Sequence, residues 1–340
     1  MTPSRHLISI SATRGFTLVE LVVVLVIISI LASLSLAGMG SLRQRAKVDK
    51  TTSTIRKLHE IVWPLVGGIY SRRLGSASGS PFFVAPSGLT GKQLSAWERR
   101  ELIRRQQVLE MPETWNEVAE FDSDPTHNDY VLPNSVALSL SLSWPHNRLS
   151  ALTSPRNFTT PVKGFAARKG AVSSHPRRDD YASAECLFMI VAFSGEPDIL
   201  ETFHASEIGD KDGDGAPEFH DGWGKPILFM RWAPGISYSQ IQQADPSTNP
   251  DLTDPMRLDP SEHGLIPLIW SGGADDSLSD WNPTDPGYGF QATNAGWMAA
   301  LMSASNGSPS SLYSICTSTN GQSLTPNAAD NITNHALPLR

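Results

Sequence analysis

The pattern of hydrophobic and polar residues changes sharply along the first part of the chain. Residues 21–42 contain no charged side chain. Such a run predicts one apolar helix able to cross a bilayer, because about 20 helical residues span the ~30 Å hydrocarbon core. Ile55, Leu58, Val62 and Leu65 then recur at intervals of three and four residues. This spacing predicts that the helix continues with one apolar face that packs on a folded body.

A proline predicts where this helix ends. Pro64 has no backbone N–H group and disfavours helical geometry at Trp63. We therefore expect one long helix over residues 16–64, with a transmembrane segment over 18–39.

The remaining chain has the mixed pattern of a folded domain. Residues 94–111 and 181–193 predict helices, whereas 227–232 and 265–271 predict strands. The last segment, 303–340, is rich in Ser, Asn and Thr. That composition predicts a polar tail, either loose or forming an irregular edge.

Composition is consistent with a single anchored globular body. The chain has 340 residues, 40% of them hydrophobic, which is enough for a packed core. Its formal net charge of −7 argues against general nucleic-acid binding. The two cysteines, Cys186 and Cys316, fit an exported chain either as one disulfide or as two buried thiols.

A processing signal precedes the apolar run. Residues 1–15 contain Arg5 and Arg14 but no acidic residue, and the chain from Arg14 reads RGFTLVEL. An ordinary secretory signal is cut after its apolar region, whereas Gly15 lies before it. This order resembles the prepilin peptidase site of type IV pilins and type II secretion pseudopilins. The resemblance implies cleavage of the leader after Gly15, methylation of the new amino terminus at Phe16 and retention of the helix.

Glu20 places a carboxylate within the apolar helix. An acidic residue costs about 2.5–3.5 kcal/mol at the bilayer centre and less near the edge, so a compensating charge is expected. Cleavage would create an α-amine on Phe16, one helical turn away. In an assembled filament a neighbouring subunit's amine could pair with Glu20 instead and set the axial register. The alternative is an uncleaved signal anchor that tolerates a glutamate at its edge.

Flanking charges and the processing motif imply opposite orientations in the membrane. Arg43, Arg45, Lys47 and Lys50 follow the apolar run, and a count of positive residues would place the carboxyl side in the cytoplasm. Large domains are translocated despite their charge, and the motif implies, by resemblance, that the body lies outside. We therefore expect a single-pass inner-membrane protein that enters a periplasmic filament.

A second motif predicts a calcium site. The stretch DKDGDGAPEFHD places Asp210, Asp212 and Asp214 at loop positions one, three and five, with glycine at six and acids at nine and twelve, Glu218 and Asp221. This is the oxygen-ligand spacing of an EF-hand-type loop. Because Asp221 replaces the usual glutamate and neither flank predicts a helix, we expect an isolated EF-hand-like or dockerin-like loop. The alternative is a polar Asp/Gly turn held by local hydrogen bonds.

The segments after this loop resemble a narrower group. DGWGKPILFMRW predicts a turn over 221–226 and the strand over 227–232, and LIPLIWSGGADDSLSDW predicts the strand over 265–271 with an acidic loop. This order resembles the carboxyl-terminal sheet of type II secretion major pseudopilins, although the connection between the strands is longer here. In that family the loop after the last strand binds calcium, and the resemblance places Asp275 or Asp276 there.

The resemblance implies an α+β fold and a structural role. We expect the long amino-terminal helix, transmembrane in its first half, to pack on a globular domain over 65–302 that contains a small antiparallel sheet. The implied function is that of a structural subunit of a type II secretion pseudopilus rather than an enzyme. Its implied partners are prepilin peptidase, other pseudopilin subunits and an inner-membrane assembly platform.

Two other functions remain open. A type IV minor pilin for adhesion, motility or DNA uptake would carry the same amino-terminal signal. A membrane-anchored metal hydrolase could use His204, His220 and His263, which lie near several aspartates in the sequence. The sequence contains no HExxH, GxSxG or nucleotide-binding loop in support of a hydrolase.

Overall fold

The computed structural model describes only part of the chain. The described residues are 16–72, 88–89, 91–115, 117–118, 120–122, 129–131, 160–172, 175–177, 181–196, 198–231, 241, 250–254, 256–257, 264, 266–273 and 332–337. The side chains of residues 34–39 are not among those described. The predicted leader over 1–15 and Cys316 lie outside the described residues.

The chain forms two compact units, residues 1–46 and 47–340. Helix α1 (Leu18–Ser71) contributes residues to both. Where the side chains of the first unit are described, the large apolar ones are exposed, including Leu21, Val24 and Ile28. Ser29 donates its hydroxyl to the Leu25 carbonyl at 2.7 Å, so this polar group is satisfied within the helix.

Among the residues that the structure describes, no helix combines the length and the apolar character that crossing a membrane requires. The predicted segment 18–39 includes residues 34–39, whose side chains lie outside that description.

In the second unit one face of α1 enters the core. Ile55, Leu58, Val62, Val66 and Ile69 are buried and recur every three or four residues. This confirms the predicted amphipathic continuation, with Val66 rather than Leu65 as the buried residue after Val62.

Pro64 does not end the helix, so the predicted boundary is wrong. Although proline removes one helical hydrogen bond, α1 continues to Ser71. Val66 and Ile69 lie beyond the proline and are at most 3% exposed. Full burial of such side chains contributes about 1.5–3 kcal/mol each, which offsets the local cost of the proline.

The other elements belong to the second unit. Its helices are α2 (Lys92–Glu110), α5 (Thr160–Val172) and α6 (Ala182–Ala192), with 3₁₀ turns η2 (Ile199–Thr202) and η3 (Ala205–Glu207). Its strands are β1 (Glu120–Asp122), β2 (Asp129–Val131), β3 (Ile208–Gly209), β4 (Glu218–Phe219), β5 (Leu228–Met230), β6 (Leu268–Ser271) and β7 (Ile332–Thr333). The predicted helices over 94–111 and 181–193 are therefore confirmed as α2 and α6.

All the described strand pairs are antiparallel. β1 pairs with β2, β3 pairs with β4, and β5, β6 and β7 form a three-stranded sheet in that order. Both predicted carboxyl-terminal strands are present, β5 within 227–232 and β6 within 265–271. The observed architecture is the expected α+β fold, with a long helix packed on a domain that contains small antiparallel sheets.

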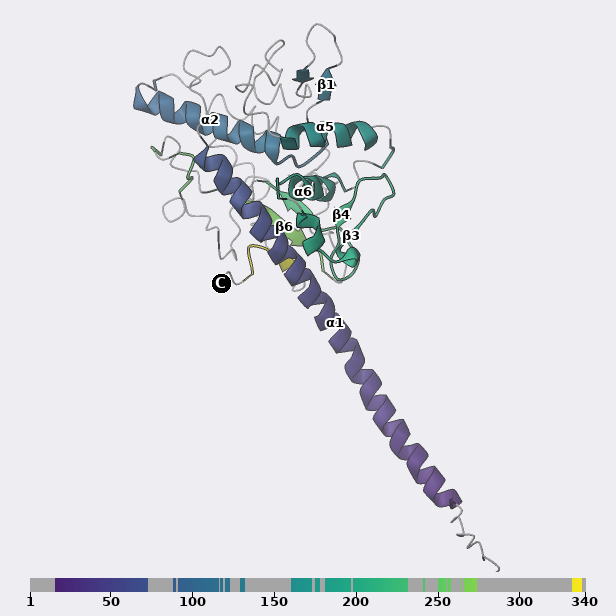
Figure 1. Cartoon of the computed structure of the whole chain (residues 1–340). Helices are drawn as coiled ribbons and strands as arrows, with labels where there is room; N and C mark the ends of the chain where they lie inside the picture. The colour runs from purple at the N-terminus through teal and green to yellow at the C-terminus, as the bar shows by residue number, and fades with distance from the viewer. Residues whose placement is uncertain are drawn as a thin grey trace, which may run out of the picture. The chain divides into compact units, whose positions relative to one another are not determined.

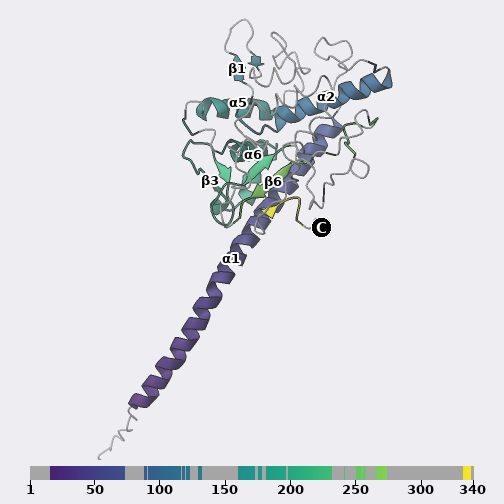
Figure 2. The ribbon, with the colours of Figure 1, turned by 180° about the vertical axis from the view of Figure 1, so that it is seen from behind.

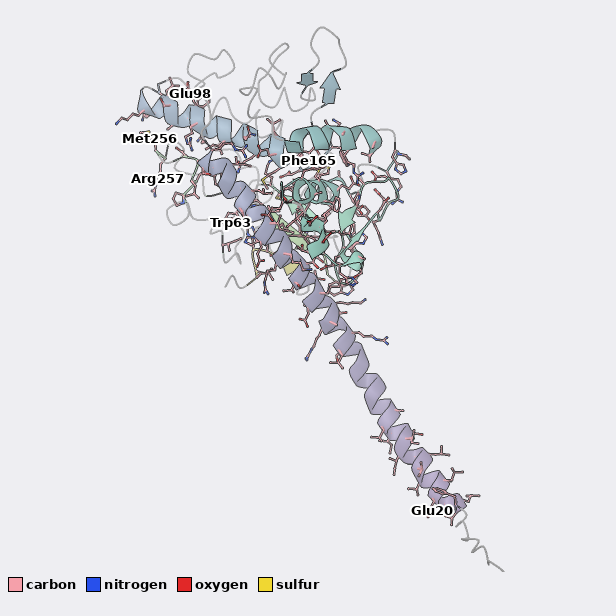
Figure 3. The ribbon with its side chains drawn as sticks, in the orientation of Figure 1. Glu20, Trp63, Glu98, Phe165, Met256 and Arg257 are labelled. Carbon is pink, nitrogen blue, oxygen red and sulfur yellow. The ribbon has the colours of Figure 1, made fainter. Side chains whose placement is uncertain are left out.

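Helix α6 lies in the middle of this domain. α2 and α5 lie on one side of it, and β3, β4 and β6 lie on the other (Figures 1 and 2). Phe188 of α6 contacts Phe219 of β4 with ring centroids 5.2 Å apart. Phe165 of α5, which is labelled in Figure 3, contacts Phe193 with ring centroids 5.7 Å apart. An almost entirely apolar helix is stable in this position because every face meets protein.

Cys186 lies within α6 as a free, fully buried thiol. Burial raises the pKa of the thiol well above its ordinary value, so little reactive thiolate forms at neutral pH. Cys186 is therefore a buried thiol, which is one of the two predicted alternatives.

The DGWG turn makes a close contact with α1. The Gly222 N–H donates to Thr51 Oγ1 at 2.8 Å. A Cβ atom at Gly222 would collide with the Lys47 backbone, so only glycine allows the turn to approach the helix this closely. The turn predicted over 221–226 is confirmed by a hydrogen bond from the Asp221 N–H to the Lys225 carbonyl at 2.8 Å.

Residues 332–337 form a sheet edge rather than a loose tail. β7 pairs with β6, and Asn334 Oδ1 accepts the Ile269 N–H at 2.8 Å. Asn334 Nδ2 lies 3.1 Å from His59 Nδ1 on α1. Polar side chains at this edge therefore satisfy buried backbone groups and join the sheet to the helix.

We expect buried His335 to make the fold sensitive to acid. Its side chain is 0% exposed, its Nε2 lies 3.1 Å from the Pro267 carbonyl, and burial lowers its pKa from 6.5 to about 4. Between these pH values the unfolded state binds more protons, so stability falls as pH drops through this window, by up to about 3 kcal/mol from this group.

Denaturant unfolding at pH 7 and pH 4.5 checks this expectation. His335→Gln should lose less stability between the two pH values than the wild type does. Equal losses in the two proteins would contradict a role for His335 in the acid sensitivity.

Candidate functional site

The amino-terminal end of α1 presents the predicted processing and assembly residues. Gly15 lies outside the described residues, whereas Phe16 is 74% exposed. Glu20 lies in the first turn of α1 (Figure 3). In this uncleaved chain its Oε2 accepts hydrogen bonds from the Thr17 N–H and hydroxyl, both at 2.9 Å.

Thr17 and Glu20 form a reciprocal cap. The Glu20 N–H donates to Thr17 Oγ1 at 3.2 Å, which completes the capping box expected of threonine followed by glutamate three residues later. The nitrogen of Phe16 is a peptide amide in the uncleaved chain, so its pairing with Glu20 as a free amine stays a prediction.

The predicted calcium loop connects β3 and β4. β3 ends at Gly209 and β4 begins at Glu218, so the loop is the turn of a hairpin, without the flanking helices of an EF-hand. Gly213 and Gly215 have φ angles of 79° and 94°. Glycine adopts this left-handed geometry without strain, which permits the sharp turn.

The acidic side chains of the loop hold its backbone, Asp210 through both carboxylate oxygens and Asp212, Asp214 and Glu218 through one each. The amide-to-carboxylate hydrogen bonds are Gly213 and Gly215 to Asp210 (2.6 and 3.0 Å), Asp214 to Asp212 (3.2 Å), Ala216 to Asp214 (2.6 Å) and Lys211 to Glu218 (3.0 Å). These bonds fix the carboxylates in one arrangement before any ligand arrives.

Three of these carboxylates keep a buried oxygen without a hydrogen-bond partner. The atoms are Asp212 Oδ2, Asp214 Oδ2 and Glu218 Oε1. The three residues are 6%, 9% and 0% exposed, respectively. An unpaired buried oxygen loses its hydration without replacement, so each of these atoms is a potential cation ligand.

Glu185 on α6 completes the cluster. Its Oε2 accepts a hydrogen bond from Trp115 Nε1, and its Oε1 is buried without a partner. Ligand oxygens of Glu185, Asp212 and Asp214 all lie within 4.8 Å of one another. The helix therefore supplies a carboxylate that the loop motif did not predict.

A second group of ligand oxygens shares Asp212. Oxygens of Asp210, Asp212 and Glu218 also lie within 4.8 Å of one another. Four of the five predicted calcium ligands are thus brought together, with Asp212 common to both groups.

Burial and mutual repulsion both disfavour the charged forms of these carboxylates. Burial, together with the nearby Asp214, Asp212 and Glu218, raises the pKa of Glu185 to about 9, against the hydrogen bond from Trp115 that lowers it. Burial also raises the pKa of Asp212, with contributions from Asp214 and Glu218. A cation between these oxygens would favour their charged forms.

Asp221, the fifth predicted ligand, is engaged elsewhere. Its Oδ1 accepts the N–H groups of Trp223 and Lys225 at 2.7 and 2.9 Å, and its Oδ2 accepts the Ser271 hydroxyl at 2.7 Å. Asp221 thus stabilises the turn before β5, because the hairpin geometry carries position twelve away from the other ligands. Asp275 and Asp276 lie outside the described residues.

The histidines considered for a hydrolase have other surroundings. His204 caps η3, where its Nδ1 accepts the Ser206 N–H at 3.2 Å. His220 Nε2 lies 3.6 Å from Glu218 Oε2, and His263 lies outside the described residues. Where side chains are described, the groups able to hold a metal contain only carboxylates.

Comparison with known proteins identifies the amino-terminal segment. Residues 10–36 match the prokaryotic N-terminal methylation motif. No curated protein and no solved structure matches the chain. The motif supports a type IV pilin-like, prepilin-type protein. It marks a pilin-like structural protein rather than a member of a known enzyme family. It implies processing by prepilin peptidase and assembly with other pilin subunits.

Proposed function

We propose that this chain is a structural subunit of a type II secretion pseudopilus. The observation that carries the proposal is the methylation motif over residues 10–36, located at the start of a helix that extends to Ser71. In this proposal the first part of the helix anchors the subunit in the inner membrane, and an assembly platform then draws it into a periplasmic filament.

The exposed apolar side chains of α1 support the filament role. Residues from Leu18 to Leu31 are mostly large, apolar and exposed. Apolar surface on this scale marks an interaction surface for lipid or protein. A bilayer would cover it before assembly, and the helices of neighbouring subunits would cover it afterwards.

Contacts within the second unit hold the part of α1 that begins at Lys47 against the body, so that the two move together. Glu207 of η3 accepts hydrogen bonds from Thr54 and Lys57 of α1. Lys50 donates to the Ser206 carbonyl at 3.0 Å, and Arg72 pairs with Glu110 of α2. Force applied along the helix would be transmitted to the body through these bonds.

The preference for secretion rests on the carboxyl-terminal sheet. β5 follows the DGWGKP turn and pairs with β6, whose last residue, Ser271, begins the segment SGGADD. This order supports a pseudopilin over a minor pilin of an adhesion, motility or DNA-uptake system, the alternative we retain.

Deletion of the gene, with complementation, tests the choice between systems. We expect proteins to disappear from the culture supernatant of the deletion strain and to return with the wild-type gene. An unchanged supernatant combined with loss of twitching or transformation would contradict the secretion proposal and support the minor pilin.

Glu20→Val tests the role of the amino-terminal carboxylate in assembly. The variant should reach the membrane at wild-type levels but form at least about tenfold fewer filaments, the effect of about 1.4 kcal/mol in the equilibrium between free and assembled subunits. Filaments sheared from cells and quantified by immunoblot give the measurement. Glu201→Val, an exposed change in η2, should assemble normally. Normal assembly of Glu20→Val would contradict the pairing of Glu20 with a subunit amine.

A further inference from the structure

We infer that the β3–β4 hairpin and α6 form a Ca²⁺ site in which Glu185 supplies the ligand from outside the loop. The other ligands are Asp210, Asp212, Asp214 and Glu218. The inference concerns the folded body and does not depend on which filament the subunit enters.

The unpartnered oxygens are the main evidence. Glu185, Asp212, Asp214 and Glu218 each bury a carboxylate oxygen that lacks a hydrogen-bond partner. Buried polar atoms are nearly always paired, and four unpaired acceptors in one cluster require a donor or a cation. The 4.8 Å limit on separations within each triad matches ligands that surround one ion at 2.3–2.6 Å.

The chemistry of the donors favours calcium. Ca²⁺ accepts six to eight oxygen ligands in flexible geometry, whereas Mg²⁺ requires a nearly ideal octahedron and retains several waters. Five carboxylates at loop positions one, three, five and nine and on α6 supply hard oxygen ligands without nitrogen or sulfur. Such a set does not suit zinc or copper.

Glu185 takes over the role that the loop's last position has in an EF-hand. Asp221 occupies position twelve but is held in the turn before β5. Glu185 approaches the loop from α6, and its Oε1 remains available while Trp115 holds Oε2. Binding would therefore fasten the hairpin to the central helix of the body.

Calcium titration of the full-length protein in detergent provides the test. After dialysis against EDTA, calorimetry should give saturable Ca²⁺ binding, and Ca²⁺ at 100 times Kd should raise Tm by about 5 °C or more. Mg²⁺ at the same concentration should raise Tm less. Absence of saturable Ca²⁺ binding, or stronger binding of Mg²⁺, would overturn the inference.

Conservative variants separate a ligand from a structural residue. Glu185→Gln and Asp212→Asn should each weaken Ca²⁺ binding at least about tenfold, equivalent to about 1.4 kcal/mol. Without calcium, Glu185→Gln should melt no lower than the wild type, because it replaces a buried carboxyl group with a neutral amide of nearly the same shape. Glu196→Gln, the same change at an exposed position, should bind like the wild type. Unchanged affinity in Glu185→Gln would show that α6 supplies no ligand.

Discussion

Replacing Gly15 with valine is expected to abolish processing, so that the full-length precursor accumulates in the membrane. The motif over residues 10–36 identifies a prepilin-type segment, and the cut is predicted to follow the glycine. Valine places a branched side chain at the scissile bond where glycine has none. Immunoblotting and intact mass of the membrane fraction measure the ratio of precursor to mature chain.

A second valine substitution controls for a general effect on the leader. Ala12→Val adds similar bulk three residues before Gly15 and should be processed normally. Mature chain of wild-type mass from Gly15→Val would contradict the predicted cleavage site.

Replacing Arg231 with methionine is expected to destabilise the body by about 3–5 kcal/mol, because it leaves a buried glutamate without its counter-charge. Arg231 is 1% exposed. Its guanidinium donates to both carboxylate oxygens of Glu117, at 2.8 and 3.2 Å, and to the Met111 carbonyl at 2.7 Å. These bonds connect the end of β5 to the segment after α2.

Denaturant unfolding of the full-length protein measures this loss. Arg257→Met, the same change at an exposed position, should alter stability by less than about 0.5 kcal/mol. Arg231→Met combined with Glu117→Gln should recover part of the loss, because the carboxylate that pairs with Arg231 is then replaced by a neutral amide. A single variant as stable as the wild type would contradict a structural role for this pair.

Local patterns predicted α1, α2, α6 and the strands β5 and β6, but they did not predict α5. The apolar spacing from Ile55 onward and the apolar run around Cys186 each correspond to an element of the body. In both cases the residues that decide the structure are neighbours in sequence. Pro64 departs from its local preference, because contacts made by Val66 and Ile69 with distant parts of the chain outweigh it.

The candidate cation site was predictable only in part. The spacing of Asp210, Asp212 and Asp214 identified the loop, since those ligands lie within one turn. Glu185 is distant in sequence, and the only available signal was an acidic residue in the otherwise apolar stretch AECLFMIVAF. Asp221 satisfied the spacing rule, but it binds the turn before β5. The motif does not encode the hairpin geometry, which decides that Glu185 lies near the loop and that Asp221 lies in the turn before β5.

The mass of the mature amino-terminal peptide tests the central claim most directly. Protein purified from the membrane and digested for mass spectrometry should give a first peptide that begins at Phe16 and carries one additional methyl group. A peptide that begins at residue 1, or one that begins after the apolar run over 21–42, would contradict the assignment as a processed, pilin-like filament subunit.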